Sequence, residues 1–276
     1  MDRIRLIASD MDATLLDEQS QLPADFEETI HALAELGIRF APASGRPLYT
    51  LEAMFPSLQD ELVFIGDNGG AIRWKGQNLF TSEMSPKGWR ALNRLTREQG
   101  DIAVLCGLES AYVERPFAVH DAVLRHFYTK IEYVDRLEDV AAPADKFTIY
   151  LPQHNAQQAY DTVYASQRSI YSVAVAGECW VDIMNPGVHK GAALQTLGQL
   201  WGLPSESIMA FGDTYNDAEM LQTVRYGFLM ENGSEPLRQK VPFLAPSHRE
   251  AGVMQVLHRV LAQNGCVCPE DFVPAH

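Results

Sequence analysis

Apolar positions fall into short runs that alternate with longer amphipathic stretches at both ends of the chain. The runs Ile4–Ser9, Ile38–Ala43 and Ser207–Phe211 are too short for ordinary helices and predict buried strands. Between the first two, residues Pro23–Leu36 have helical spacing, and Gly37 ends the stretch. Strand, helix and strand in this order are typical of a parallel sheet, so the chain predicts an α/β fold.

Further runs extend this predicted sheet. Leu62–Ile65 is expected to be a third strand, followed by Ala71–Trp74 after a short connection. Near the other end, Tyr226–Met230 predicts another strand and Glu250–Leu261 a last helix. The residues after this helix, which include two prolines, are read as a tail.

The middle of the chain has a different pattern. Its apolar runs are short and closely spaced, as in antiparallel strands, and helix-like stretches fall between them. The predicted strands are 102–105, 111–114, 146–151, 170–175 and 179–183, and the predicted helices begin at Ser85-Pro86 and cover about 119–127 and 153–166. We therefore expect an α+β domain of residues 84–184 inserted between two parts of the sheet domain, 1–83 and 185–276.

Two acidic clusters lie some two hundred positions apart, each directly after a predicted strand. Asp10 and Asp12 follow the first strand, and Asp213 and Asp217 follow the strand that turns at Gly212. Side chains alternate along an extended chain, so Asp10 and Asp12 are expected to point the same way. In an open α/β sheet the carboxyl ends of the strands meet at one edge. We therefore expect all four carboxylates to gather there.

Four carboxylates at one place repel each other strongly unless a cation compensates them. Oxygen ligands suit Mg²⁺, so Asp10, Asp12, Asp213 and Asp217 are the candidate ligands. Asp10, at the strand end, is the candidate nucleophile for attack on phosphorus. Asp12 is placed to protonate the leaving oxygen and later to deprotonate water. The pattern favours phosphoryl transfer.

A transferred phosphoryl group needs donors for its oxygens, and several residues are placed to supply them. Ser44 and Gly45 follow the second predicted strand, and a hydroxyl with a bare backbone N–H is suited to an anion. The candidate phosphate-binding residues are Thr14, Ser44, Gly45, Lys190 and Asn216, and the candidate substrate contacts are Arg46 and Asn68.

The same segments, in order, resemble the four motifs of the haloacid dehalogenase-like (HAD) phosphatases: Asp10-Met11-Asp12-Ala13-Thr14, Ser44-Gly45-Arg46-Pro47, Lys190-Gly191 and Gly212-Asp213-x-x-Asn216-Asp217. The long insertion, Phe64–Gly70 and Gly252-Val253 resemble the Cof-type branch, which carries a large C2-type cap. The resemblance implies a Rossmann-like parallel-sheet core with an inserted α+β cap. It also implies a Mg²⁺-dependent phosphatase that works through an aspartyl phosphate.

One position departs from the family pattern. The family usually has glycine where this chain has Ala13. Alanine resists positive φ, so either the backbone is ordinary there or the turn carries strain.

Composition narrows the classes of partner. A chain of 276 residues is long enough for two domains. Its net charge of −14 argues against nucleic acid as a partner, because binding of nucleic acid requires clustered Lys and Arg. No apolar run approaches the roughly 20 residues of a membrane helix, so we expect no membrane partner and a cytoplasmic protein. The four cysteines lack metal-site spacing and are read as free thiols. The sequence does not specify an oligomeric state.

The predicted function is a phosphatase for a small phosphorylated metabolite. Sugar phosphates, phosphorylated vitamins or cofactors such as FMN and pyridoxal phosphate, and nucleotides are all compatible with the motifs. Three alternatives stay open: a phosphotransferase or phosphomutase, a receiver-like module that stores phosphate on Asp10, and a phosphate-binding protein without turnover.

Overall fold

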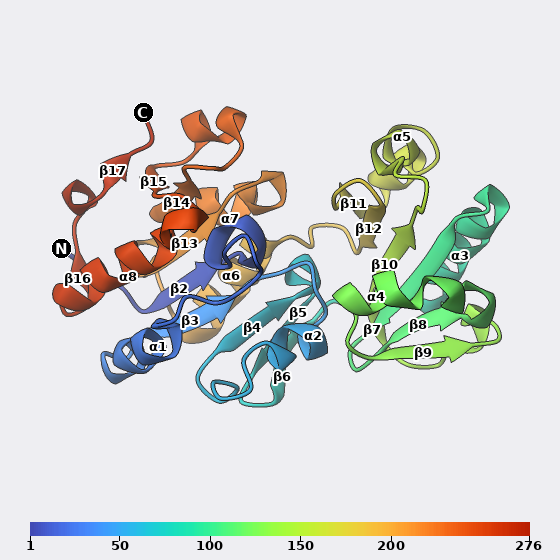
Figure 1. Cartoon of the computed structure of the whole chain (residues 1–276), viewed down its shortest axis with the longest axis horizontal. Coiled ribbons are helices and arrows are strands. Elements are labelled where there is room, and N and C mark those ends of the chain that lie inside the picture. The colour runs from blue at the N-terminus through green and yellow to red at the C-terminus, as the bar shows by residue number, and fades with distance from the viewer.

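The computed structural model describes residues 1–276 and contains two six-stranded sheets at opposite ends of its long axis (Figure 1). A three-stranded sheet lies between them in this view, and both chain termini lie at the same end. The α/β class predicted from the sequence is confirmed.

The first sheet contains the strands that precede the acidic clusters. Its order is β17 (Val273–Pro274), β15 (Phe243–Ala245), β14 (Tyr226–Met230), β13 (Ile208–Gly212), β2 (Leu6–Ser9) and β3 (Arg39–Pro42). All neighbours are parallel except the edge strand β17. The helices of this part are α1 (Phe26–Glu35), α2 (Leu48–Ala53), α6 (Lys190–Trp201), α7 (Ala218–Thr223) and α8 (Gly252–Ala262).

The strand order places the site. The chain leaves β2 toward β3 on one side and returns, after the insertion, to β13 on the other side. Such a reversal opens a crevice at the carboxyl ends of the two central strands. Ser9 pairs with Phe211, so the residues that follow each strand emerge beside each other.

The predicted third parallel strand belongs mainly to another sheet. β4 (Val63–Gly66) pairs antiparallel with β5 (Ala71–Trp74), which pairs with β6 (Gln77–Thr81). Only one bridge, Ala43 to Ile65, joins it to the parallel sheet. β4 pairs with β5 along its whole length, from Val63↔Trp74 to Gly66↔Ala71, whereas it meets the end of β3 at that single bridge.

We call residues 84–184 the cap segment. Its sheet has the order β11 (Ser172–Val175), β12 (Trp180–Met184), β10 (Ala144–Tyr150), β7 (Ile102–Gly107), β8 (Ala111–Glu114) and β9 (Ile131–Val134). Neighbouring strands are antiparallel except for β8 and β9, which are parallel. The sequence prediction did not include β9. The helices are α3 (Pro86–Gln99), α4 (Asp121–Phe127) and α5 (Ala156–Asp161).

Helix α3, predicted to begin at Ser85-Pro86, has clear signals at both ends. The Ser85 side chain accepts a hydrogen bond from the Gly88 N–H, Pro86 occupies the first turn, and Gly100 ends the helix in the left-handed conformation. The helix predicted over 153–166, by contrast, is only six residues long. It ends before Thr162, Val163 and Tyr164, a β-branched and aromatic run with low helix propensity.

Buried apolar side chains form separate clusters in the two parts. The buried members of the clusters in the parallel-sheet part come only from residues 4–72 and 193–275, and the partly buried Leu108 of the cap segment packs against one of them. Those of the cap segment draw only on residues 84–183. No helix has both the length and the apolar character needed to cross a bilayer.

The C-terminal residues, expected to be a tail, are part of the fold. β16 (Cys266–Val267) pairs with β1 (Asp2–Arg3), and β17 pairs with β15. Phe272 is 6% exposed and packs against the rings of Tyr226, Phe228 and Phe243 at centroid distances of 5.8, 5.0 and 5.8 Å. This aromatic contact compensates for the short strands around it.

The aromatic cluster yields a stability prediction. Phe272→Ala should lower the free energy of unfolding by about 3 kcal/mol or more, because a buried ring is removed from a packed cluster. Val273, which is 61% exposed, provides the control: Val273→Ala should change the free energy by no more than about 0.5 kcal/mol. Equal effects of the two variants in urea unfolding would show that the C-terminal segment does not contribute to the core.

Candidate active site

Asp10 lies immediately after β2, at the edge where the central strands end. Its backbone N–H continues the sheet by donating to the Phe211 carbonyl at 2.9 Å, so the strand pairing fixes the start of the acidic segment. Met11–Leu15 then forms a turn, closed by the Leu16 N–H donating to the Met11 carbonyl at 2.9 Å, in which Asp12 keeps extended backbone angles and Ala13 is left-handed. The turn means that strand alternation does not govern Asp12.

Lys190 joins the two acidic clusters. It is the first residue of α6, its side chain is fully buried, and its ammonium donates to Asp10 and to Asp217 Oδ1, the latter at 2.7 Å. Burial alone would lower the pKa of Lys190, but Asp10 and Asp217 outweigh burial and raise the pKa. The lysine is therefore charged and lies behind the carboxylates.

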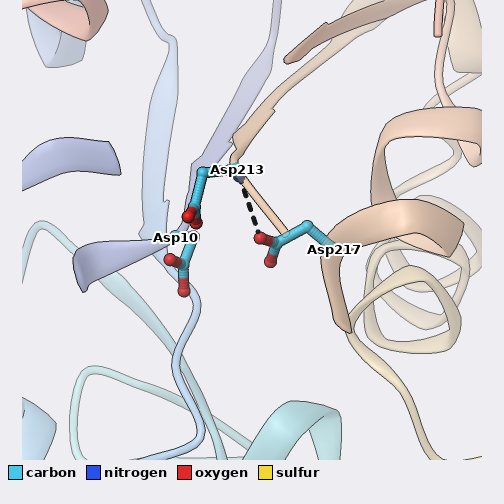
Figure 2. Close-up of side chains that lie close together, drawn as sticks. All are labelled: Asp10, Asp213 and Asp217. Carbon is cyan, nitrogen blue, oxygen red and sulfur yellow. Dashed lines mark hydrogen bonds between the residues drawn. The ribbon is translucent and has the colours of Figure 1, made fainter. Parts of the chain in front are cut away.

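The second acidic cluster is shaped by its backbone. Asp217 Oδ2 accepts from the N–H groups of Asp213 and Thr214 at 3.1 and 3.3 Å, which closes the turn after β13 (Figure 2). Gly212 permits this turn because a Cβ there would lie 2.4 Å from the Asp217 Cβ. The carboxylates of Asp10, Asp213 and Asp217 converge as a result.

The converging carboxylates carry excess negative charge. One oxygen from each of Asp10, Asp213 and Asp217 lies within 4.8 Å of the others, and the Lys190 ammonium is bonded to Asp10 and Asp217. Burial is the main reason that the pKa of Asp10 is raised to about 8; Lys190 opposes the rise, and Asp217 adds to it. Burial, and then Asp217, raises the pKa of Asp213 to about 6.

This donor set fits a divalent cation. In their ionised forms the three carboxylates, with one ammonium, sum to two negative charges, the charge that a divalent ion neutralises. The ligands are all oxygen, the type that Mg²⁺ prefers over softer metals. Asp12, expected as a fourth ligand, lies outside this group.

Asp12 is held by Arg46. Arg46 Nη1 and Nη2 donate to the two Asp12 oxygens at 2.6 and 3.0 Å, a bidentate ion pair. Arg46 thus contacts the predicted acid–base residue. The Asp12 side chain is largely exposed toward the cavity described below.

The predicted phosphate-binding residues surround the carboxylates. Thr14 Oγ1 donates to Asp213 Oδ1 at 3.3 Å, and Ser44 Oγ accepts from the Arg46 N–H at 3.1 Å. Asn216 and Asn68 approach each other at 3.5 Å. Gly45 packs directly on the Asn68 side chain, where an added Cβ would lie 3.3 Å from its amide.

One large cavity connects this site with the cap segment. Its volume is about 1210 Å³. On the side of the acidic residues it is lined by Asp10, Asp12, Ser44, Gly45, Arg46, Asn68, Asp213 and Asn216. Thr14, Lys190 and Asp217 lie behind this wall and are not part of the lining. The cap contributes aromatic side chains, among them Phe127, Tyr128 and Trp180.

Two cap residues near the site were missed in the sequence. Lys146 and Asp182 line the cavity although both are almost fully buried, and Asp182 Oδ2 accepts from the Asn68 amide at 3.2 Å. The available signal was a charged residue inside a run that otherwise reads as a buried strand. Such residues are costly to bury unless they have partners.

Ala13 adopts the conformation that its side chain disfavours. Its φ is 57° and its ψ 13°, in the left-handed region. The Ala13 carbonyl accepts from Asn232 Nδ2 at 2.9 Å, which helps to hold the turn. The turn is therefore strained, by about 1–2 kcal/mol for a residue with a Cβ.

The profile of the haloacid dehalogenase-like hydrolases matches residues 7–257, nearly the whole chain. The chain belongs to this family. The family resemblance drawn from the motifs is confirmed.

Curated relatives of this HAD-like hydrolase are phosphatases. It is 31% identical over 262 residues to the Escherichia coli 5-amino-6-(5-phospho-D-ribitylamino)uracil phosphatase YbjI, covering 94% of this chain and 96% of the relative. It is also 31% identical over 249 residues to the HMP-PP phosphatase of Cronobacter sakazakii, covering 87% and 89%. The prediction of a phosphatase is confirmed at this level.

Solved structures agree on the fold of the HAD-like hydrolase. SMU.1108c from Streptococcus mutans matches with a TM-score of 0.85 at 28% identity, covering 94% of this chain and 99% of that one. A haloacid dehalogenase-like hydrolase from Bacteroides thetaiotaomicron matches with a TM-score of 0.81 at 22% identity, covering 94% and 100%. The second comparison supports the fold alone.

Because Ala13 is strained, we expect its replacement by glycine to stabilise the folded protein. Ala13→Gly should raise the free energy of unfolding by up to about 1 kcal/mol, since relief of the left-handed strain exceeds the entropy that glycine adds to the unfolded chain. The matched control is Ala91→Gly in the exposed middle of α3, which should lower it by about 1 kcal/mol. Loss of stability in both variants would show that the Ala13 turn is relaxed.

Excess charge predicts a pH dependence of the metal-free protein. The folded-state pKa values of Asp10 and Asp213, about 8 and about 6, lie above the unfolded value of about 3.9. The folded state therefore binds more protons between these limits. The stability contributed by protonation is fully present below about pH 4 and is lost as the pH rises through about 6 and 8.

The Asp213→Asn variant isolates this dependence. Its free energy of unfolding in EDTA should fall less than that of the wild type between about pH 4 and pH 6, because the titrating carboxyl is gone. Asp60→Asn, at an exposed position, should keep the wild-type slope. Urea unfolding at several pH values measures both, and identical slopes in all three proteins would contradict the charge argument.

Proposed function

We propose that this HAD-like hydrolase is a Mg²⁺-dependent phosphatase that forms an aspartyl phosphate on Asp10. The observation that carries the proposal is the placement of Asp10: it lines the cavity, Lys190 holds its Oδ1, and Asp213 and Asp217 stand beside it. Oδ1 is fixed while Oδ2 is left to attack phosphorus. Asp10 is thus oriented as a nucleophile.

Residues of the site supply and take up the protons for both steps, formation and hydrolysis of the aspartyl phosphate. Asp10 forms a bond to phosphorus as the bond to the leaving oxygen breaks, and Asp12 gives its proton to that oxygen. Asp12 then takes a proton from water, whose oxygen attacks phosphorus and releases Asp10 and inorganic phosphate. Arg46 releases Asp12 in this scheme and pairs with a phosphoryl oxygen, a role to which its two donors are suited.

Other residues bind the phosphoryl group and balance the charge of the site. Ser44, Gly45 and Asn216 line the cavity and supply a hydroxyl, a backbone N–H and an amide for its oxygens. Lys190 opposes the rise in the pKa of Asp10 and so favours its ionised form. Mg²⁺, when bound by Asp10, Asp213 and Asp217, supplies the positive charge that lets the phosphate approach these carboxylates.

We propose residues 84–184 as the cap domain, with residues 1–83 and 185–276 as the catalytic core. Separate apolar clusters support this division. The cap forms the far wall of the cavity, where the part of the substrate beyond its phosphate would bind. A cover of this kind excludes water from the reacting group.

The proposed substrate is a small phosphorylated metabolite, with a heteroaromatic ring as the first class to test. Two observations support the ring: Phe127, Tyr128 and Trp180 line the cap wall, and the relative YbjI is named for a phosphorylated ribitylaminouracil. The cavity volume of about 1210 Å³ accommodates a ring and a polyol chain together. FMN, pyridoxal phosphate, nucleotides and sugar phosphates complete the panel.

The test is phosphate release from this panel with Mg²⁺ and with EDTA. Release should require the metal and should fall by at least about a thousandfold in Asp10→Asn, because an amide is nearly isosteric but a poor nucleophile. Asp60→Asn serves as the exposed carboxylate control and should retain full activity. Undiminished turnover in purified Asp10→Asn would assign the nucleophile to another residue.

The same assay separates the alternatives. Stoichiometric inorganic phosphate without an acceptor excludes a phosphotransferase or phosphomutase. A phosphoenzyme that lasts for hours supports a receiver-like module. Phosphate binding without release from any compound supports the binding protein without turnover.

A further inference from the structure

Lys146 is a buried cation that the proposed reaction does not use. It lies in β10, where all seven residues from Ala144 to Tyr150 are buried, and it is 2% exposed. A strand so enclosed normally carries apolar side chains. An ammonium in this place needs partners that compensate for its lost hydration.

The partners of Lys146 lie on both sides of the boundary between cap and core. Its Nζ donates to the Gly45 carbonyl at 2.6 Å and forms an ion pair with Asp67 Oδ1 at 3.0 Å, both in the core. Within the cap it approaches Asp182 Oδ2 at 3.6 Å. Burial opposes the charge, but Asp182 and Asp67 raise the pKa of Lys146, so the ammonium is retained.

The contact with Gly45 completes a pattern in the phosphate-binding loop. Three successive carbonyls of this loop accept hydrogen bonds. The Ser44 carbonyl accepts from the Asn68 N–H at 2.9 Å, and the Arg46 carbonyl accepts from the Asp67 N–H at 2.9 Å. The core backbone thus holds the outer two, and the Lys146 side chain of the cap holds the middle one.

The middle carbonyl controls the orientation of Ser44. The peptide that joins Gly45 to Arg46 is planar, so fixing its C=O also fixes its N–H on the opposite side. This N–H donates to Ser44 Oγ at 3.1 Å. Lys146 therefore acts on the Ser44 hydroxyl through one peptide plane.

We propose that Lys146 is a positioning residue that completes the phosphate-binding loop from the cap. With the cap docked, its ammonium fixes the Gly45–Arg46 peptide and thereby the Ser44 hydroxyl. Without this contact the glycine-containing loop has additional backbone freedom, which phosphate binding must then remove. The inference rests on the proposed function because it takes Ser44 and Gly45 as phosphate ligands.

The energetic coupling is reciprocal. If docking of Lys146 raises the affinity of the loop for phosphate, bound phosphate must favour the docked cap by the same factor. The cap then does more than cover the cavity, because one of its side chains prepares the core to bind the group that reacts.

The probe for this role is inorganic phosphate, which is small enough to contact the core site alone. Calorimetric titration in the presence of Mg²⁺ compares the wild type with Lys146→Met, and the dissociation constant should rise on the order of tenfold, as for loss of one hydrogen bond from a charged group. Lys87→Met removes the same charge from an exposed cap position and should leave the constant unchanged.

A second variant guards against unfolding. Lys146→Met leaves Asp67 buried without its cation, whereas Lys146→Met with Asp67→Asn removes both members of the pair and costs much less stability. Asp182 keeps its hydrogen bonds from Thr148 and Asn68 in this double variant. The double variant should show the same weakening of phosphate binding.

The outcomes separate this role from others. Wild-type phosphate affinity in a folded Lys146 variant overturns the proposal. If the KM of that variant for substrate is raised, Lys146 contacts the leaving group. If only its Tm is lowered, the role of Lys146 is purely structural. Lack of phosphate binding by the wild type also overturns it. Phosphate binding without hydrolysis of any substrate would contradict the proposed phosphatase function but not the positioning role.

Discussion

The site depends on one ion cluster, the Lys190 ammonium between Asp10 and Asp217. These three residues come from the end of β2, the start of α6 and the turn that follows β13. The cluster therefore joins parts of the chain that the insertion separates by 180 residues. Without the cation, buried carboxylates would repel each other or take up protons, and the two central strands would end without a fixed geometry between them.

The cluster also explains a local conflict in the sequence. A lysine in the first turn of a helix is unfavourable, because the helix dipole is positive there. α6 nonetheless begins with Lys190, and two carboxylates offset the dipole. Conversely, Asp217 stands where the dipole favours an anion and where it accepts two backbone N–H groups. The ion cluster thus outweighs the helix dipole at the N-terminus of α6, whereas Asp217 agrees with the dipole at the N-terminus of α7.

Much of this arrangement could be predicted because it follows from contiguous segments. The strands before Asp10 and Asp213 and the turn at Gly212 are short, local patterns, and the acidic residues after them were expected to meet. The partner of Asp12 could not be derived in this way. Its carboxylate is placed by the turn from Met11 to Leu15 and by the ion pair with Arg46. Neither feature produces a periodic pattern of apolar residues in the sequence.

The errors in the fold have the same origin. β4 was assigned to the parallel sheet because an apolar run does not show which neighbour it pairs with, and in the structure it pairs along its length with β5 and only by one bridge with the parallel sheet. The C-terminal residues looked like a tail because two-residue strands have no period, although Phe272 anchors them through ring contacts. Long-range contacts, rather than local propensity, determine both outcomes.

Buried lysines occur twice around this cavity, and the difference between them clarifies the division of labour. Lys190 bonds only to residues of the core, so the carboxylate geometry exists whatever the cap does. Lys146 bonds across the boundary and reaches a backbone carbonyl of the phosphate loop. A charge buried within one domain stabilises a fixed arrangement, whereas a charge buried between two domains ties the arrangement to their docking, because separation would return the ammonium to water and leave the carbonyl without its donor. The proposed nucleophile is thus prepared by the proposed core alone, whereas the loop proposed to receive the phosphate is prepared by core and cap together.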